Sequence, residues 1–315
     1  MVNRRTASML TLRIALLTLV LLVVQGIGAQ FLPGSESPPV SGEDVVVTQP
    51  EQSPGFLGLI LSICLLQTVA LAYPALRSRW YGWRLAAATF VLFFGTVTFM
   101  SQVESLIYIR GINPEGKLAG LLLMGLFNAA VFSPVLVFLL GKWRPGNDSA
   151  DESLSGMSKL TWAGKLAVGS AVFLALYYLF GYYVAWKNPA VRDYYGGSDP
   201  GSFFAQMGNV IHDTPWMLPV QFLRGFLWVV LALLVIRMMK GPWWEKGLAI
   251  SLLFTLPTLY LLYPNPMMPE PVRMAHLVET APYQFLFGWF VAWLFGRRGL
   301  TALTPSPDPE PVSGT

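Results

Sequence analysis

Charged residues are scarce in this sequence, and cysteine is almost absent. Lys, Arg, Asp and Glu make up 12% of the 315 residues, about half of the roughly 25% typical of soluble domains. The single cysteine, Cys64, lies within an apolar segment, which excludes an intrachain disulfide and favours a role as a small packing residue. The motifs H-E-x-x-H, G-x-S-x-G and Walker A are missing, as are paired-cysteine metal motifs, so none of these enzyme or metal-site classes is indicated.

The sequence is instead rich in long apolar segments. Hydrophobic residues make up 54% of the chain, the mean hydropathy is +0.53, and apolar runs of roughly 18 to 24 residues recur, long enough to cross about 30 Å of hydrocarbon. The sequence therefore predicts an all-α integral membrane protein with a bundle of about eight transmembrane helices. Its expected partners are membrane lipids rather than nucleic acid, despite the net charge of +4.

Eight spans are predicted from these runs. They cover about residues 14–31, 55–76, 85–108, 118–141, 161–186, 219–239, 247–263 and 275–295. The first is either a retained span or a signal peptide cleaved near Ala29, because its apolar core is short and small residues follow it. In the fifth span, alanines at positions 163, 167, 171 and 175 form a ridge that predicts close approach of another helix.

The connecting segments fall into two kinds. Residues 32–54 and 142–160 and the tail 299–315 are rich in Pro, Ser, Gly or acidic residues, which predicts a flexible outer loop, a flexible cytoplasmic loop and a disordered cytoplasmic tail. The outer loop 187–218 keeps several aromatic residues, and Ser202 is placed to cap a short helix from about Phe203 to Ile211. That helix either covers a site at the membrane surface or belongs to a plain connecting loop with interfacial anchors.

Orientation follows from the distribution of Lys and Arg. With the N-terminus inside, thirteen lie at inner ends and five in outer loops, which predicts that both termini are cytoplasmic. The inner residues are Arg4, Arg5, Arg77, Arg79, Arg84, Lys142, Arg144, Lys159, Arg237, Lys240, Lys246, Arg297 and Arg298. The outer residues are Arg110, Lys117, Lys187, Arg192 and Arg273.

Polar residues within the spans gather at one depth, near the outer side. The inner halves of the same spans are almost free of such residues, so the sequence predicts one polar site open to the outer face. The candidates are Gln102, Glu104, Asn128, Gln221, Arg224, His276 and Glu279. Gln102, Asn128, Gln221 and Arg224 are expected to contact a substrate or to form ion pairs, with Arg224 holding Glu104, Glu279 or an anionic group, or reaching toward the interface.

His276 and Glu279 are one helical turn apart and share a helix face. One interpretation is a divalent metal site, with Glu104 and His212 as further ligands. Another is catalysis by Glu104, His276 and Glu279, in which a carboxylate orients the imidazole or activates water. A third interpretation is structural: His276 would be interfacial, and Glu279 would lie near the positive end of its helix.

Three functions are compatible with these features. The first is a membrane-embedded hydrolase or transferase that acts on a lipid or a membrane-proximal peptide in a bacterial plasma (inner) membrane. The second is a structural or accessory membrane subunit. The third is a proton- or cation-coupled transporter, which the scarcity of polar residues in the inner halves of the spans disfavours. The sequence does not separate an enzyme from an accessory protein, and it leaves open whether the chain binds a protein partner or itself.

Overall fold

The computed structural model describes residues 4–32, 55–108, 115–144, 157–264 and 268–296. Within these ranges the chain is helical and has no strand, and Ser78 and Met239 form an isolated antiparallel bridge. Of the segments predicted to be flexible, residues 33–54, 145–156 and 299–315 lie outside the described residues, and α6 already begins at Lys159 within the predicted cytoplasmic loop 142–160. The prediction of an all-α fold is confirmed.

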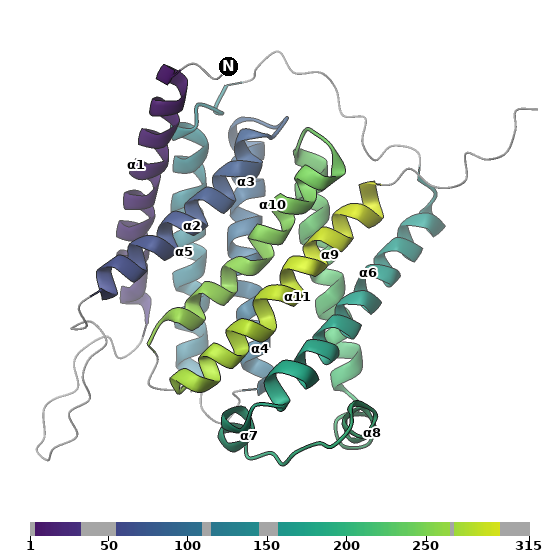
Figure 1. The fold of residues 1–315 in the computed structure, drawn as a ribbon. Helices are drawn as coiled ribbons and strands as arrows, with labels where there is room; N and C mark the ends of the chain where they lie inside the picture. Colours follow the sequence, from purple (N-terminus) through teal and green to yellow (C-terminus); the bar gives the residue numbers. More distant parts are fainter. Residues whose placement is uncertain (1–3, 33–54, 109–114, 145–156, 265–267, 297–315) are drawn as a thin grey trace, which may run out of the picture.

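The helices follow one another as hydrophobic segments separated by short connections (Figure 1). The long ones are α1 (Arg4–Gly28), α2 (Phe56–Leu76), α3 (Gly82–Phe93) continued by α4 (Met100–Tyr108), α5 (Glu115–Leu139), α6 (Lys159–Phe180), α9 (Met217–Met238), α10 (Trp243–Thr255) and α11 (Glu270–Gly296). Two short helices, α7 (Pro189–Tyr195) and α8 (Phe203–Asp213), lie together at one end of the bundle. A 3₁₀ segment, η5 (Leu256–Leu262), continues α10 and has Pro257 as its second residue.

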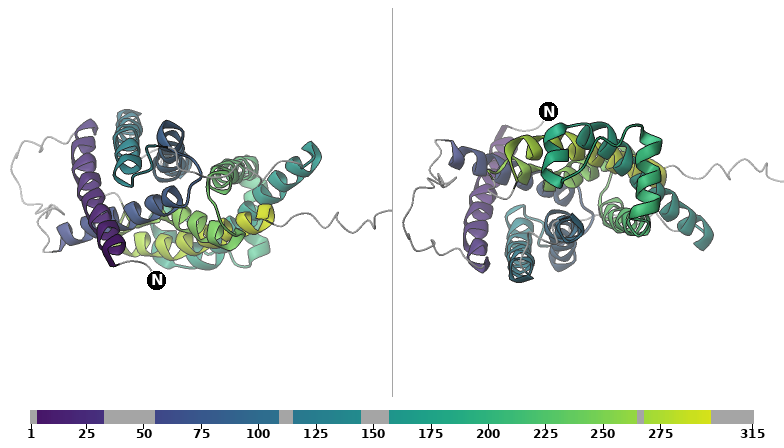
Figure 2. Two further views of the ribbon diagram at one scale, coloured as in Figure 1. Left: turned by 90° about the horizontal axis from the view of Figure 1, so that it is seen from above. Right: turned by 90° about the horizontal axis from the view of Figure 1, so that it is seen from below.

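The long helices form two layers that are joined at their edges (Figure 2). One layer holds α2, α10 and α11, and the other holds α5, α3 with α4, and α9. Helix α1 packs against both α2 and α5, and α6 packs against both α11 and α9, so these two helices close the sides. The space between the layers, at the end that α7 and α8 cover, holds the candidate site.

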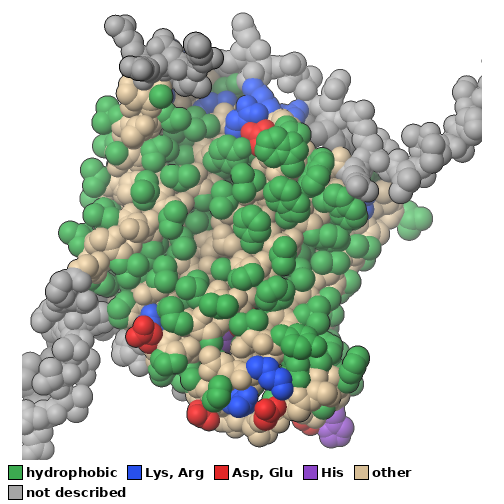
Figure 3. All heavy atoms as spheres, in the orientation of Figure 1, with side chains coloured by type: hydrophobic (Ala, Val, Ile, Leu, Met, Phe, Trp, Pro, Cys, Tyr) green, Lys and Arg blue, Asp and Glu red, His purple; other side chains and the backbone are tan. Residues whose placement is uncertain are grey.

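The outer surface of the bundle is apolar along the helices (Figure 3). Leu12, Leu57, Phe138 and Val278 are each at least 60% exposed, which suits contact with lipid rather than water. Seven helical stretches have the length and hydropathy to cross a membrane. They are residues 7–31, 56–76, 82–103, 118–139, 159–186, 217–238 and 243–262. The chain is therefore an α-helical, multi-pass membrane protein.

Glu245 ties α2 to α10 at the end of the bundle opposite α7 and α8. Its carboxylate accepts hydrogen bonds from the Arg77 guanidinium, including one of 2.9 Å from Nη2, and from the Tyr73 hydroxyl at 2.9 Å. The bond to this carboxylate also raises the pKa of Arg77. Glu245 therefore neutralises one cation at an end of the bundle that is otherwise rich in Lys and Arg.

Replacing Glu245 with alanine is expected to lower the stability of the bundle by about 1–2 kcal/mol, because Arg77 and Tyr73 lose their shared acceptor. The value stays modest because the Arg77 side chain is 47% exposed and can turn to solvent. The measurement is the thermal melting temperature of the detergent-purified protein. Glu245→Gln should melt between Glu245→Ala and the parent protein. Glu270→Ala, at an exposed helix start, is the control and should melt like the parent. Equal melting of Glu245→Ala and the parent would contradict the role of Glu245 in joining α2 to α10.

Glycines and other small residues set the closest helix contacts. A Cβ atom on Gly288 of α11 would lie 2.7 Å from the backbone nitrogen of Ser251 in α10, and a Cβ on Gly225 of α9 would lie 2.9 Å from the backbone oxygen of Ser170 in α6. The predicted alanine ridge of the fifth span is wrong as a contact surface, because Ala163, Ala167, Ala171 and Ala175 are all exposed. Helix α6 approaches α9 through Gly169 and Ser170 instead.

Two helices contain a π-helical turn beside the space between the layers. The segment η3 (Phe94–Phe99) joins α3 to α4, and η4 (Gly181–Trp186) ends α6. Such turns bulge the helix locally and occur often at functional sites. Both segments contribute side chains to the cavity described below.

The segment between α6 and α9 is ordered, and α8 matches the helix predicted there. The Ser202 hydroxyl accepts a hydrogen bond from the Ala205 amide, so the predicted N-cap is confirmed. The Tyr182 hydroxyl donates to the Gly201 carbonyl, and the Gly201 amide and nearby cations, chiefly Lys187, lower the pKa of Asp199. Because this pKa is depressed in the folded protein, the ionised Asp199 contributes to the free energy of unfolding at neutral pH. That contribution is lost as the pH falls through the folded-state pKa.

Candidate functional site

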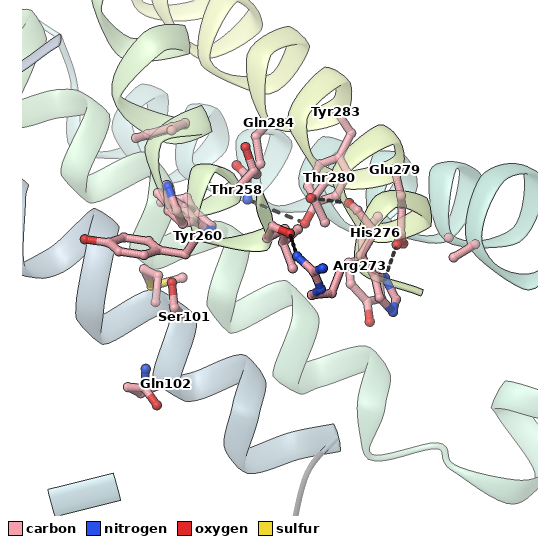
Figure 4. A pocket seen from close by; sticks show the side chains of 18 of the residues that line it. Ser101, Gln102, Thr258, Tyr260, Arg273, His276, Glu279, Thr280, Tyr283 and Gln284 are labelled. Carbon is pink, nitrogen blue, oxygen red and sulfur yellow. Dashed lines mark hydrogen bonds and ion pairs between the residues drawn. The ribbon is translucent and has the colours of Figure 1, made fainter. Parts of the chain in front are cut away.

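A cavity of about 780 Å³ lies between the two helix layers, at the end of the bundle where α7 and α8 lie (Figures 1 and 4). Small-molecule sites in proteins have volumes of about 300–1,000 Å³. The walls come from the α3–α4 segment, α5, the end of α6, α9, η5 and α11, and residues of α7 and α8 line its end. Most lining side chains are aromatic or aliphatic, with a smaller set of polar groups among them.

His276 and Glu279 form a hydrogen-bonded pair on the cavity wall (Figure 4). The distance from His276 Nδ1 to Glu279 Oε2 is 2.7 Å, and the Glu279 side chain is 8% exposed. An ionised carboxylate only accepts hydrogen bonds, so it holds the imidazole with its proton on Nδ1 and leaves Nε2 as an acceptor. This is the arrangement in which a carboxylate orients a histidine for acid–base chemistry.

Tyr195 of α7 completes a chain of three polar groups. Its hydroxyl lies 3.2 Å from His276 Nε2 and is placed to donate to it. The pair is brought together from positions 81 residues apart, because α7 packs against the start of α11. The resulting order is carboxylate, imidazole and phenol, and all three residues line the cavity.

Arg273 lies one turn before His276 on the cavity wall. Its Nη1 donates to the backbone carbonyls of Leu261, at 2.8 Å, and Tyr263, so the guanidinium holds the end of η5 against α11. The residue is 7% exposed, and its Nε has no hydrogen-bond partner among the residues that the structure describes. Arg273 therefore places a buried cation at the mouth of the cavity.

Further polar groups lie deeper along the wall. The atoms Asn128 Oδ1, Tyr178 Oη, Trp228 Nε1 and Gln284 Oε1 are buried and have no hydrogen-bond partner within the described part of the chain. These four residues come from α5, α6, α9 and α11, and each lines the cavity. A buried polar atom left unpaired costs about 1–3 kcal/mol. These atoms are enclosed by protein rather than open to the cavity: Asn128 Oδ1, for example, lies against Gly28 of α1, where an added Cβ atom would collide with it.

Gln102, Asn128, His276 and Glu279 are brought together in the cavity lining, in keeping with the convergence predicted from their depth. Gln221 and Arg224 lie at a comparable level in α9 but are not among the lining residues. Both are at most 2% exposed. Arg224 Nη1 donates to Gln221 Oε1 at 2.7 Å, and the guanidinium lies 5.8 Å from the ring centres of Phe173 and Tyr177. The structure therefore places this arginine in the wall between α9 and α6.

The predicted metal ligands do not all come together among the described residues. His212 is at the end of α8, with a side chain 90% exposed and hydrogen-bonded to Asp213. No group of three His, Cys, Asp or Glu residues able to hold a metal is present in the part of the chain that the structure describes. The side chain of Glu104 lies outside that part, so its assignment as a ligand, base or partner of Arg224 stays a prediction.

Several residues of the cavity could not be singled out from the sequence. Tyr178, Trp228 and Tyr283 are aromatic residues within spans, where such residues are common, and Tyr195 lies in the outer loop. Gln284 could have been found, since it is a polar residue within the last span. Gln25 is another case: it donates to Gln67 at 2.8 Å, and both bond to the Tyr260 hydroxyl at the side of the cavity.

No protein-family model, curated protein sequence or solved structure matches the chain at a significant level.

Proposed function

We propose that the chain crosses a bacterial plasma membrane eight times, with both termini in the cytoplasm. The seven stretches described above supply seven crossings, and α11, which runs beside α10 (Figure 1), supplies the eighth. The excess of Lys and Arg at the end opposite α7 and α8 supports a cytoplasmic location for that end. The cavity then opens toward the outer side.

The function we propose is that of a membrane-embedded hydrolase or transferase acting on a lipid or a membrane-proximal peptide. The observation that carries this proposal is the Glu279–His276–Tyr195 chain on the wall of a cavity of ligand size. A structural role alone gives no reason for an oriented imidazole to line a cavity. Catalytic acids and bases are expected in such clefts, next to a group that fixes their orientation.

In the proposed hydrolysis, water attacks the carbonyl carbon of an ester or amide. His276 Nε2 accepts the proton of the water, and the carboxylate of Glu279 stabilises the imidazolium that forms. The bond to the leaving group breaks, and the leaving group takes the proton from His276. In a transferase, an acceptor hydroxyl or amine takes the place of water. Tyr195 is a positioning residue: its hydroxyl is hydrogen-bonded to His276 Nε2 until substrate or water takes its place.

We expect His276→Ala to lower turnover at least about 100-fold, the lower end of the usual contribution of general acid–base catalysis. Nanodisc-held protein would be incubated with a polar lipid extract and with a pool of apolar peptides, and products would be counted by mass spectrometry. Glu279→Gln should also lower turnover. Val278→Ala is the matched control, because Val278 lies on the same helix and is 60% exposed.

Two results would count against the enzyme proposal: no product from either substrate class, or equal turnover of His276→Ala and the parent protein. Metal analysis of the same preparations tests the predicted metal site separately. Stoichiometric metal lost in both His276→Ala and Glu279→Ala would identify these residues as ligands. Without product or metal, the accessory-subunit function would remain.

A further inference from the structure

Helix α8 lies where two membrane spans reach the end of the bundle. The span that contains α6 ends at Trp186, and the span of α9 begins at Met217, which only residues 214–216 separate from α8. In Figure 1, α8 is seen along its own axis whereas the long helices are seen from the side, so α8 lies across the bundle. This is the position of a helix that lies in the plane of a membrane surface.

Two faces of α8 differ in what they contact. Gln206 and Val210, four residues apart, line the cavity, and Thr214 continues this face beyond the helix. Phe204 and Ile211 are seven residues apart, which brings them to one side of the helix. Their side chains are 83% and 61% exposed. Large apolar side chains therefore cover a face of α8 that no described part of the chain buries.

A third face of α8 is polar. Asn209 and His212 are exposed on it, and the rotation of about 100° per residue places them away from Phe204 and Ile211. An amphipathic helix of this kind suits the boundary between lipid and water, with the apolar face in lipid and the polar face in water. Residues 203–211 carry no charged side chain, so apolar burial rather than attraction to anionic head groups would hold the helix there.

The apolar face of α8 is continuous with the lipid-facing surface of the bundle. Tyr183 belongs to the span of residues 159–186 and is 62% exposed. Its ring stacks on that of Phe203, with ring centres 6.1 Å apart, and the ring of Phe203 lies 5.8 Å from that of Phe204. Exposed aromatic surface thus runs from a membrane span onto α8, which selects lipid as the occupant of this face.

We infer that α8 is embedded in the membrane surface at the cavity end of the bundle. Phe204 and Ile211 contact the acyl chains just below the head groups, and Asn209 and His212 face water. Because the face that begins with Gln206 lines the cavity, α8 forms a partition between the bilayer and the cavity. This inference does not depend on the proposed enzyme function.

The test is the depth of nitroxide labels on the full chain in phosphatidylcholine nanodiscs. Labels are attached one at a time to Phe204→Cys, Ile211→Cys, Asn209→Cys and His212→Cys. Power saturation with oxygen, which concentrates in hydrocarbon, and with a water-soluble nickel chelate gives each depth. We expect the labels at 204 and 211 to lie about 5–10 Å into the boundary between head groups and acyl chains, and those at 209 and 212 to lie in water.

The parent protein is the control for labelling, because its single cysteine, Cys64, is buried. A thermal melt of each labelled variant checks that the bundle is intact. Equal depths at all four positions, or labels at 204 and 211 in water, would overturn the inference. Labels at 204 and 211 shielded from both reagents would overturn it too, because protein, such as a second copy of the chain, would then cover the face. Insertion that required added phosphatidylglycerol would contradict the apolar mode of binding.

Discussion

Replacing Gly288 with leucine is expected to prevent the bundle from folding. The first side-chain carbon would lie 2.7 Å from the backbone nitrogen and 2.8 Å from the Cα of Ser251, and 3.0 Å from the backbone carbon of Ile250. Backbone atoms cannot rotate out of the way, so α10 and α11 would have to separate. Ordinary overpacking costs about 1–3 kcal/mol. We expect Gly288→Ala to fall at the upper end of that range and leucine to exceed it.

Fluorescence-detected size exclusion and a thermal melt in detergent would measure the effect. Gly164→Leu is the matched control, because Gly164 lies in the long helix α6 and its Cβ position has no atom within 4 Å. That variant should elute and melt like the parent protein. A folded Gly288→Leu protein with parent-like melting would show that α10 and α11 are not packed as described.

Arg224→Ala is expected to have the second-largest effect, with a loss of roughly 3–5 kcal/mol of stability. Gln221 Oε1 would lose its 2.7 Å donor in a fully buried position, which costs about 1–3 kcal/mol. The contact of the guanidinium with Phe173 and Tyr177 adds about 2 kcal/mol when the cation is desolvated. The measurement is again the thermal melt in detergent.

Two comparison variants sharpen this prediction. Arg224→Lys keeps the charge and loses the planar group that lies over the rings, so it should fall between the parent and the alanine variant. Leu223→Ala removes a neighbouring side chain that is 57% exposed, and it should change the melt little. If Arg224→Ala melted at the same temperature as Leu223→Ala, Arg224 would belong to a ligand site rather than to the wall between α9 and α6.

The predicted depth of the polar residues depends only on distance along each helix, which the sequence supplies. The convergence of Gln102, Asn128 and Glu279 on one cavity follows from that depth. Depth does not give the rotation of a helix about its axis. Arg224 has a comparable depth and yet faces Phe173 of α6 rather than the cavity.

Contacts between segments far apart in the chain could not be predicted from the sequence for a related reason. Spacing of four showed that the alanines of the fifth span share a face, but not which helix would meet that face, and the face is exposed. The true contact of α6 with α9 uses Gly169 and Gly225, which no periodic pattern singles out. Tyr195 reaches His276 across 81 residues through the packing of α7 on α11, and no local rule predicts such a pair.

The π turn η3 determines where the α3–α4 segment can lose a residue without disturbing the cavity wall. A π turn holds an extra residue relative to an α-helix, and one residue turns an α-helix by about 100°. Deleting a single residue within η3, such as Val97, would let the segment rewind into a regular helix. The π turn already absorbs that extra residue, so the helix beyond it would keep its phase and Gln102 would stay on the cavity wall. The same deletion in the regular helix α3 would instead turn Gln102 by about 100° about the axis.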